Sequence, residues 1–111
     1  MKKLTIIVIL LISLFFRCEK IDKDAPHCID DKIRDFAKSN SCETASVGQW
    51  TFQEGNVYVF SEGSCCCDRG AAVFNESCEQ IGYLGGFTGN MIINNVRFYD
   101  VAVFNKIIWE E

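Results

Sequence analysis

Seven cysteines in a chain of 111 residues constrain the fold more than any other feature of this sequence. Cysteine at this density is typical of small domains that fold in an oxidising compartment. A domain of fewer than 100 residues buries only about 60–65% of its unfolded surface, so it is marginally stable without cross-links. We therefore expect disulfides to be part of the fold.

The first of the seven, Cys18, follows a short apolar run. Lys2 and Lys3 precede Leu4–Phe16, which is shorter than the roughly 20 residues of a membrane-crossing helix and has the length of a signal-peptide core,. A cysteine directly after such a run looks like a bacterial lipoprotein signal. We expect cleavage before Cys18 and lipidation of Cys18, with an uncleaved anchor and ordinary secretion as the alternatives.

This interpretation divides the chain into three parts. Residues 1–17 form a lipoprotein-type signal peptide, residues 18–27 the lipidated cysteine and a flexible tether, and residues 28–111 a single small globular domain. Cleavage leaves 8 of the 11 basic residues against all 15 acidic ones, a formal charge of −7. Such a surface repels phosphate backbones, so no nucleic-acid partner is expected, and the membrane is bound through acyl chains. The predicted location is the bacterial cell envelope, on the periplasmic side or the cell surface.

Residues 29–39 predict an amphipathic helix of about three turns. Ile29, Ile33, Phe36 and Ala37 recur at the spacing of one helical face,.

The residues after this helix predict strands. β-Branched and aromatic content indicates a hairpin with a tight turn at Glu54-Gly55, followed by two later strands. The predicted strands are Val47–Gln53, Asn56–Ser61, Ala71–Asn75 and Phe104–Trp109.

Two further segments do not have the pattern of a strand. Leu84–Asn90 has the Gly and Asn content of a turn, and Arg97–Val103 is ambiguous, with a helical turn before the last strand as one interpretation,. The strands are apolar on both faces, so we expect the helix on one side and loops on the other. The predicted fold class is α+β, with one N-terminal amphipathic helix packed on a small antiparallel sheet of about four strands and stapled by disulfides.

Six cysteines remain as disulfide candidates once Cys18 is set aside. A helix over residues 29–39 separates Cys28 from Cys42 by roughly 15–20 Å, whereas a disulfide needs Cα atoms within about 7 Å. These two therefore do not pair with each other, and each end of the helix is tied to the region 65–78. We expect Cys78 to pair with a member of the adjacent triplet. The candidates are Cys28, Cys42, Cys65, Cys66, Cys67 and Cys78.

The triplet Cys65–Cys67 also permits a thiol function. Structural zinc sites usually have two separated cysteine pairs, and redox centres usually have C-x-x-C, so structural disulfides are favoured. The alternative is a thiol-based redox or metal-binding protein that uses Cys65, Cys66 and Cys67. With His27 as the one histidine, a site of several imidazoles is excluded,.

No constellation of residues predicts catalysis, a metal site or a cofactor. The favoured function is a non-enzymatic binding or interaction module whose partner is an unknown envelope protein or small ligand. Exposed aromatic side chains would mark the patch that binds a partner.

The sequence resembles a family of small uncharacterised bacterial lipoproteins, classed as a domain of unknown function. The resemblance covers Cys28 to Trp109 and includes the run VYVFSEGSCCCD, followed by GG-x-x-GN and a final IW. Its carriers are Val57–Phe60, Cys66-Cys67-Asp68, Gly85-Gly86 with Gly89, Phe98, and Ile108-Trp109. The resemblance implies no activity, and therefore no functional residues.

Overall fold

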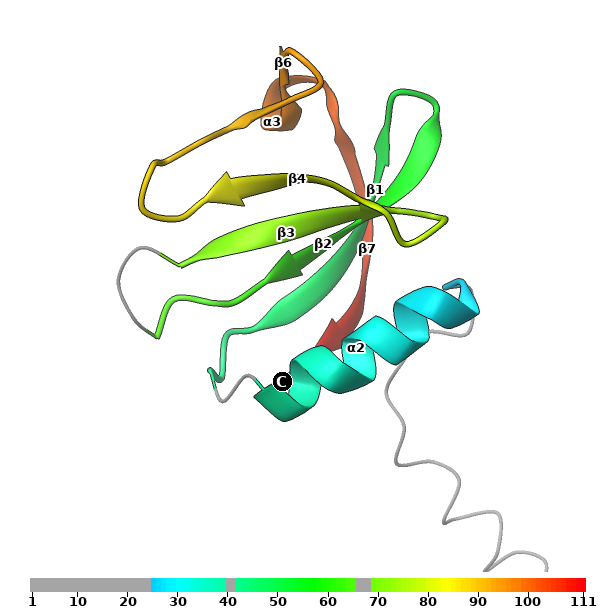
Figure 1. The fold of residues 1–111 in the computed structure, drawn as a ribbon, viewed down its shortest axis with the longest axis vertical. Coiled ribbons are helices and arrows are strands. Elements are labelled where there is room, and N and C mark those ends of the chain that lie inside the picture. Colours follow the sequence, from blue (N-terminus) through cyan, green and yellow to red (C-terminus); the bar gives the residue numbers. More distant parts are fainter. Residues whose placement is uncertain (1–24, 40–41, 66–68) are drawn as a thin grey trace, which may run out of the picture.

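A computed structural model describes residues 25–39, 42–65 and 69–111. It is built on a five-stranded antiparallel sheet in the order β4-β3-β2-β1-β7, with a two-stranded ribbon, β5-β6, beside it (Figure 1). The elements are α2 (His27–Ser39), β1 (Ser46–Phe52), β2 (Gly55–Ser61), β3 (Gly70–Asn75), β4 (Gln80–Gly85), β5 (Ile92–Ile93), β6 (Val96–Arg97), α3 (Phe98–Val101) and β7 (Val103–Glu110). Over these ranges no helix is long and apolar enough to cross a membrane.

The combination of a helix with an antiparallel sheet is confirmed, but the sheet has five strands rather than about four. The additional strand is β4, which begins before the segment Leu84–Asn90 that was interpreted only as a turn. Leu84 and Gly85 still belong to the strand, and the positive φ angles expected of a turn occur at Gly85, Gly86 and Gly89. The helical turn before the last strand is α3.

The β1–β2 hairpin turns one residue earlier than predicted. Gln53 and Glu54 both have positive φ, 50° and 68°, as a two-residue type I′ turn requires, and Gly55 opens β2,. Asn94 and Asn95 form an equivalent turn between β5 and β6.

Both faces of the sheet are covered, as the apolar strands predict. Along β2, Val57 and Val59 belong to the cluster under β5, β6 and α3, whereas Tyr58 and Phe60 belong to the cluster under α2. Successive side chains of a strand point to opposite faces, so this central strand contributes to two cores. Figure 1 shows the sheet between α2 below and the β6–α3 segment above.

Two disulfides hold α2 against the sheet, one near each end of the helix. Cys28, in the first turn, is bonded to Cys78 with a Cα–Cα distance of 6.1 Å. Cys42, just after the helix, is bonded to Cys65 at 5.6 Å. Cys28 and Cys42 thus pair with the region 65–78 and not with each other, as expected.

The predicted pairing of Cys78 with a member of the triplet is wrong, because Cys65 and Cys78 lie at opposite ends of β3. Cys65 precedes this strand and Cys78 follows it, and its six residues span about 20 Å,. The 13 residues of α2 have almost the same length, about 20 Å,. Each end of the helix therefore lies close to one of these two cysteines. Cys66 and Cys67 lie outside the described residues.

Candidate functional site

A half-open cavity of about 290 Å³ lies between α2 and the strands β2, β3 and β4. Four of its walls are aromatic side chains, and the rest are one alanine and three charged residues. The lining consists of Lys32, Asp35, Phe36, Phe60, Glu62, Ala72, Phe74 and Tyr83. We refer to this cavity as the aromatic pocket.

The floor of the aromatic pocket follows from the register of three strands. Phe60 on β2 is opposite Ala72 on β3, and Ala72 is opposite Tyr83 on β4. These three residues therefore form a row across the sheet on the face that α2 covers. The methyl group of Ala72 is much shorter than its two aromatic neighbours, so the row is hollow in the middle.

Helix α2 supplies the opposite wall. Lys32, Asp35 and Phe36 are three and four residues apart, a spacing that places them on one side of the helix,. The Phe36 ring meets Phe60 edge to face, with 5.5 Å between the ring centroids. The Lys32 ammonium lies 4.5 Å from the centroid of Phe74.

The rim of the pocket carries two carboxylates. The Tyr83 hydroxyl donates a hydrogen bond to Glu62 Oε2 at 3.4 Å. Asp35 is exposed and has no side-chain partner among the described residues. Lys32 is the one cationic residue of the lining, and Arg69 donates to the Glu62 backbone oxygen at 3.5 Å from outside it. The site therefore offers aromatic surface together with carboxylates at its rim.

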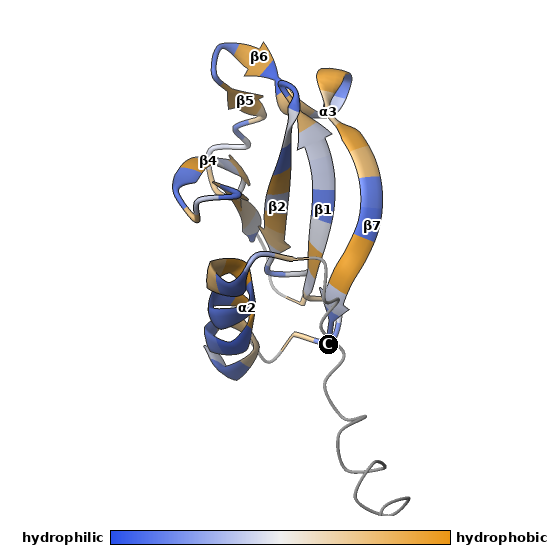
Figure 2. Cartoon of the chain, turned by 90° about the vertical axis from the view of Figure 1, so that its right-hand side faces the viewer, coloured by the Kyte–Doolittle hydropathy of each residue, from blue (hydrophilic) through white to orange (hydrophobic). Residues whose placement is uncertain are grey.

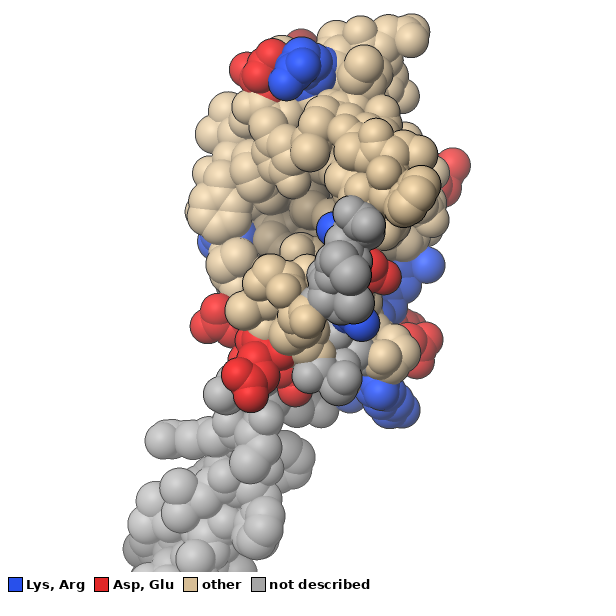
Figure 3. Space-filling model, turned by 90° about the vertical axis from the view of Figure 1, so that its left-hand side faces the viewer, with Lys and Arg blue, Asp and Glu red and all other residues tan. Residues whose placement is uncertain are grey.

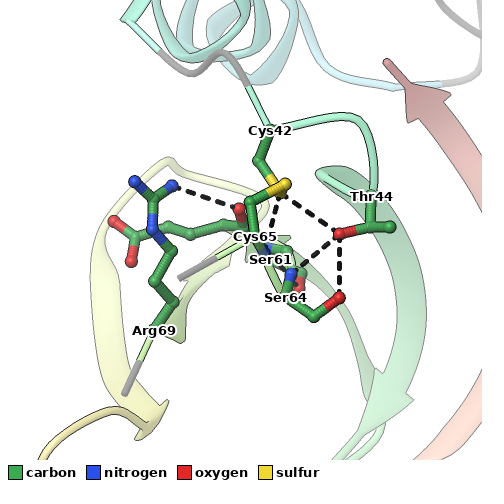
Figure 4. Close-up of a disulfide and its surroundings, with 8 residues drawn as sticks. Cys42, Thr44, Ser61, Ser64, Cys65 and Arg69 are labelled. Atoms are coloured by element: carbon green, nitrogen blue, oxygen red, sulfur yellow. Dashed lines mark hydrogen bonds between the residues drawn. A yellow bond between two sulfur atoms is a disulfide. The ribbon is translucent and has the colours of Figure 1, made fainter. Parts of the chain in front are cut away.

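The disulfide Cys42–Cys65 lies in a network of hydrogen bonds that links two segments of the chain. Cys42 is buried, and its sulfur lies 3.2 Å from both Thr44 Oγ1 and the backbone nitrogen of Cys65 (Figure 4). The Ser64 backbone N–H donates to Thr44 Oγ1 at 2.7 Å. This network fixes the end of β2 to the segment that enters β1.

The thiol alternative requires Cys65 as a thiolate, and in this structure its sulfur is bonded to Cys42. In the part of the chain that is described, no group of three His, Cys, Asp or Glu side chains is placed to hold a metal ion. His27 is exposed at the first residue of α2 and does not line the aromatic pocket. The lipidation candidate Cys18 lies outside the described residues.

Exposed large apolar side chains lie on β4, β5 and α3, in the turn after β4 and, in the largest number, along the edge strand β7. Val103, Phe104 and Ile107 expose 61%, 47% and 45% of their surface, and Figure 2 shows apolar stretches along β7 on either side of a hydrophilic middle. Two register shifts interrupt the pairing of β7 with β1. Such irregularities distort an edge strand and disfavour the addition of a further strand.

Elsewhere on the surface, Phe87 is 90% exposed in the turn after β4.

The face in Figure 3 is formed by uncharged residues over most of its area and is hollowed near its centre, whereas charged side chains gather toward its lower end. A smaller cavity of about 210 Å³ is lined by Arg69, Tyr99 and residues of β3 and β4. It has less aromatic surface than the aromatic pocket.

The sequence interpretation did not identify the aromatic pocket. Of its residues, only Phe36 was singled out, as part of the apolar face of the helix. The available signal was the aromatic alternation of residues 58–60 opposite the small pair at residues 71–72. That signal becomes specific only when the strand register is known.

Fold and site together define a small α+β domain that is stapled by disulfides and has an aromatic pocket between its helix and its sheet. The chain belongs to the family DUF6970, described as a domain of unknown function, which matches residues 33–111. The match includes every strand that the structure describes and the part of α2 from Ile33 onward. No curated protein and no solved structure matches the chain.

Proposed function

We propose that this protein is a binding module of the bacterial cell envelope, held at a membrane by acyl chains on Cys18, which takes a small organic ligand in the aromatic pocket. The observation that carries the proposal is the half-open cavity with four aromatic walls. Ligand sites are typically concave and apolar with a few polar groups, and about 290 Å³ is at the small end of their range,.

The envelope location rests on two observations. The disulfides Cys28–Cys78 and Cys42–Cys65 are typical of an oxidising compartment,. The apolar run Leu4–Phe16 ends directly before Arg17-Cys18, the arrangement of a lipoprotein signal,. Two or more acyl chains hold a protein stably at a membrane, which the acidic charge of the domain would not do.

The pocket is tested with a set of small amines, alcohols and acids of up to about ten non-hydrogen atoms, a size set by about 30 Å³ for each. Binding is followed by the NMR shifts of the Phe60, Ala72 and Tyr83 amides. The variant Ala72→Leu fills the hollow and should lose binding. The control Thr88→Leu adds an isobutyl group at an exposed turn outside the pocket and should bind normally. If no compound in the set shifts these amides in the unmodified chain, the ligand site is refuted.

The anchor and the thiols are tested by the intact mass of the protein purified from membranes. We expect an acylated Cys18 at the N-terminus. Alkylation should leave Cys28, Cys42, Cys65 and Cys78 unlabelled until the protein is reduced. An unmodified residue 18 would refute lipid anchoring. Labelling of Cys42 or Cys65 without reduction would favour the thiol alternative over a structural role.

A further inference from the structure

One wall of the aromatic pocket already contacts a positive charge. Lys32 extends from α2, and its ammonium group lies 4.5 Å from the centroid of the Phe74 ring on β3. A cation within about 6 Å of a ring centroid is attracted by the negative face of the ring. The protein therefore shows, with its own side chain, which kind of charge this wall favours.

The rings of the pocket are arranged as walls and not as a stack. Phe60 meets Phe36 at an interplanar angle of 86° and Phe74 at 74°. Tyr83 lies beyond Ala72 in the same row and forms a further wall. Rings at right angles present their faces from several directions, which is the way aromatic cages surround an alkylated ammonium ion.

The charges of the rim complement the same kind of ligand. The carboxylates of Asp35 and Glu62 lie at the rim, and Asp35 is exposed with no side-chain partner among the residues described. Glu62 accepts a hydrogen bond from Tyr83, and Arg69 donates to its backbone oxygen. Acidic residues also outnumber basic ones in the whole chain, 15 to 11, so its field attracts cations toward the surface,.

We infer that the aromatic pocket binds a small alkylated ammonium ion, whose alkyl groups contact Phe36, Phe60 and Tyr83 and whose charge faces the carboxylates of the rim. Lys32 competes with such a ligand, because its ammonium lies over Phe74 in this structure and leaves that ring when the ligand enters. This inference deepens the proposed function and rests on it, since it names the ligand class of the same site.

The first experiment compares choline with its neutral isostere 3,3-dimethylbutan-1-ol. Binding is measured by NMR titration of the chain from residue 18 onward, which is the mature protein of the proposed cleavage, carrying Cys18→Ser. The two probes have nearly the same shape and differ in charge. We expect choline to bind about ten-fold more tightly, because cation–π attraction is worth about 0.5–2 kcal/mol and ten-fold corresponds to about 1.4 kcal/mol.

Variants on α2 and β3 then test the competitor. Lys32→Met removes the internal cation and keeps an unbranched side chain, so choline should bind about five-fold more tightly. The control Lys38→Met removes a positive charge from the same helix outside the pocket and should change binding less than two-fold, as exposed charges do,. Phe74→Leu should weaken binding about five-fold.

Three outcomes overturn the inference, and they separate it from the proposed function. If the neutral isostere binds as tightly as choline, or if other compounds bind while choline does not, the site is a ligand pocket without a preference for cations. Acids that bind only when Lys32 is present would make it an anion site. If no compound of either set binds, the proposed function fails as well.

The ammonium group can belong to a free cation or to a lipid headgroup. The same chain is therefore mixed with vesicles of phosphatidylcholine or of phosphatidylglycerol. Sedimentation with phosphatidylcholine vesicles alone, reversed by free choline, assigns a headgroup as the source. Binding of free choline without vesicle binding assigns a soluble cation. Either result supports the inference.

Discussion

The two disulfides should contribute unequally to the free energy of unfolding. We expect the disulfide that closes the shorter loop to contribute more than the one that closes the longer loop. Cys28–Cys78 joins residues 50 apart in sequence, and Cys42–Cys65 joins residues 23 apart. In the chain-entropy treatment, loops of these lengths contribute about 4.1 and about 3.4 kcal/mol. Loop length alone therefore makes Cys28–Cys78 the stronger of the two cross-links by less than about 1 kcal/mol.

Packing reverses this order. Cys42 is only 2% exposed, and its sulfur lies within 3.2 Å of Thr44 Oγ1 and of the Cys65 backbone nitrogen. Cys28 and Cys78 are half-buried at the margin of the cluster beneath α2. Removal of the buried sulfur leaves a void and unpaired polar groups, at an additional cost of about 1–2 kcal/mol.

We therefore expect Cys42→Ala/Cys65→Ala to lower the free energy of unfolding by about 5 kcal/mol and Cys28→Ala/Cys78→Ala by about 4 kcal/mol. Urea titrations of both double variants and of the unmodified chain, followed by circular dichroism, measure these losses. If Cys28→Ala/Cys78→Ala is the less stable variant, the packing argument for Cys42 is refuted. Losses below about 1 kcal/mol in both would show that the sheet holds α2 without cross-links.

Three other perturbations have expected outcomes. Gly63→Ala should lower the free energy of unfolding by more than about 2 kcal/mol in a urea titration, because φ is +88° and a Cβ would lie 2.6 Å from Cys42 Sγ,. The control Gly89→Ala also has positive φ, +64°, but open space around the new Cβ, and should cost about 1 kcal/mol,. Equal losses would refute the clash. Phe98→Ala should cost about 3–5 kcal/mol, since this ring is fully buried, and a loss below about 1 kcal/mol would contradict its place in the core,. Burial raises the pKa of Tyr99, so the neutral phenol is favoured in the folded state, and the stability that this provides is present below pH of about 10 and lost as pH rises through the raised value,. The difference in phenolate absorbance between the unmodified chain and Tyr99→Phe should therefore rise above pH of about 10, and a rise at or below that pH would contradict the shift.

Local patterns were sufficient to predict the helix and the first hairpin. The apolar positions of α2 recur at helical spacing, and two runs rich in β-branched and aromatic residues flank a tight turn,. β4 was missed because its sequence QIGYLG contains two glycines and no clear alternation. Its pairing with β3, which supplies Tyr83 opposite Ala72, compensates for the weak local preference,.

The disulfide pairing was predictable further than the sequence interpretation took it. The distance argument that separates Cys28 from Cys42 along a helix also applies to a strand at residues 71–75. A strand of five residues spans about 17 Å, so the predicted strand disfavours a bridge between Cys65 before it and Cys78 after it. The sequence does not determine which end of the helix lies at which end of the strand, because that depends on the direction in which α2 crosses the sheet.

The aromatic pocket was not predictable, because it depends on three-dimensional register. Phe60, Ala72 and Tyr83 become neighbours only through two strand pairings, and a shift of one residue in either would move a side chain to the other face,. Lys32 and Asp35 have the spacing of an ordinary solvated helix face, so nothing in the sequence marks them as the wall of a cavity.

The pocket and the disulfides are connected through packing. A large apolar residue at position 72 would fill the row between Phe60 and Tyr83 and let α2 pack directly on the sheet, with more buried apolar surface and greater stability. Ala72 instead leaves the helix–sheet contact underpacked around a cavity of about 290 Å³. Ile29 and Ile33 are fully buried and hold the apolar face of α2 on the sheet, whereas the side of the helix over the hollow lacks such packing. Cys28–Cys78 and Cys42–Cys65 additionally fix the helix near its two ends. The disulfides thus offset the stability that is lost because the pocket is not filled. They also hold α2 at a distance from the sheet at which Lys32 and Phe36 form a wall of the pocket opposite the strands.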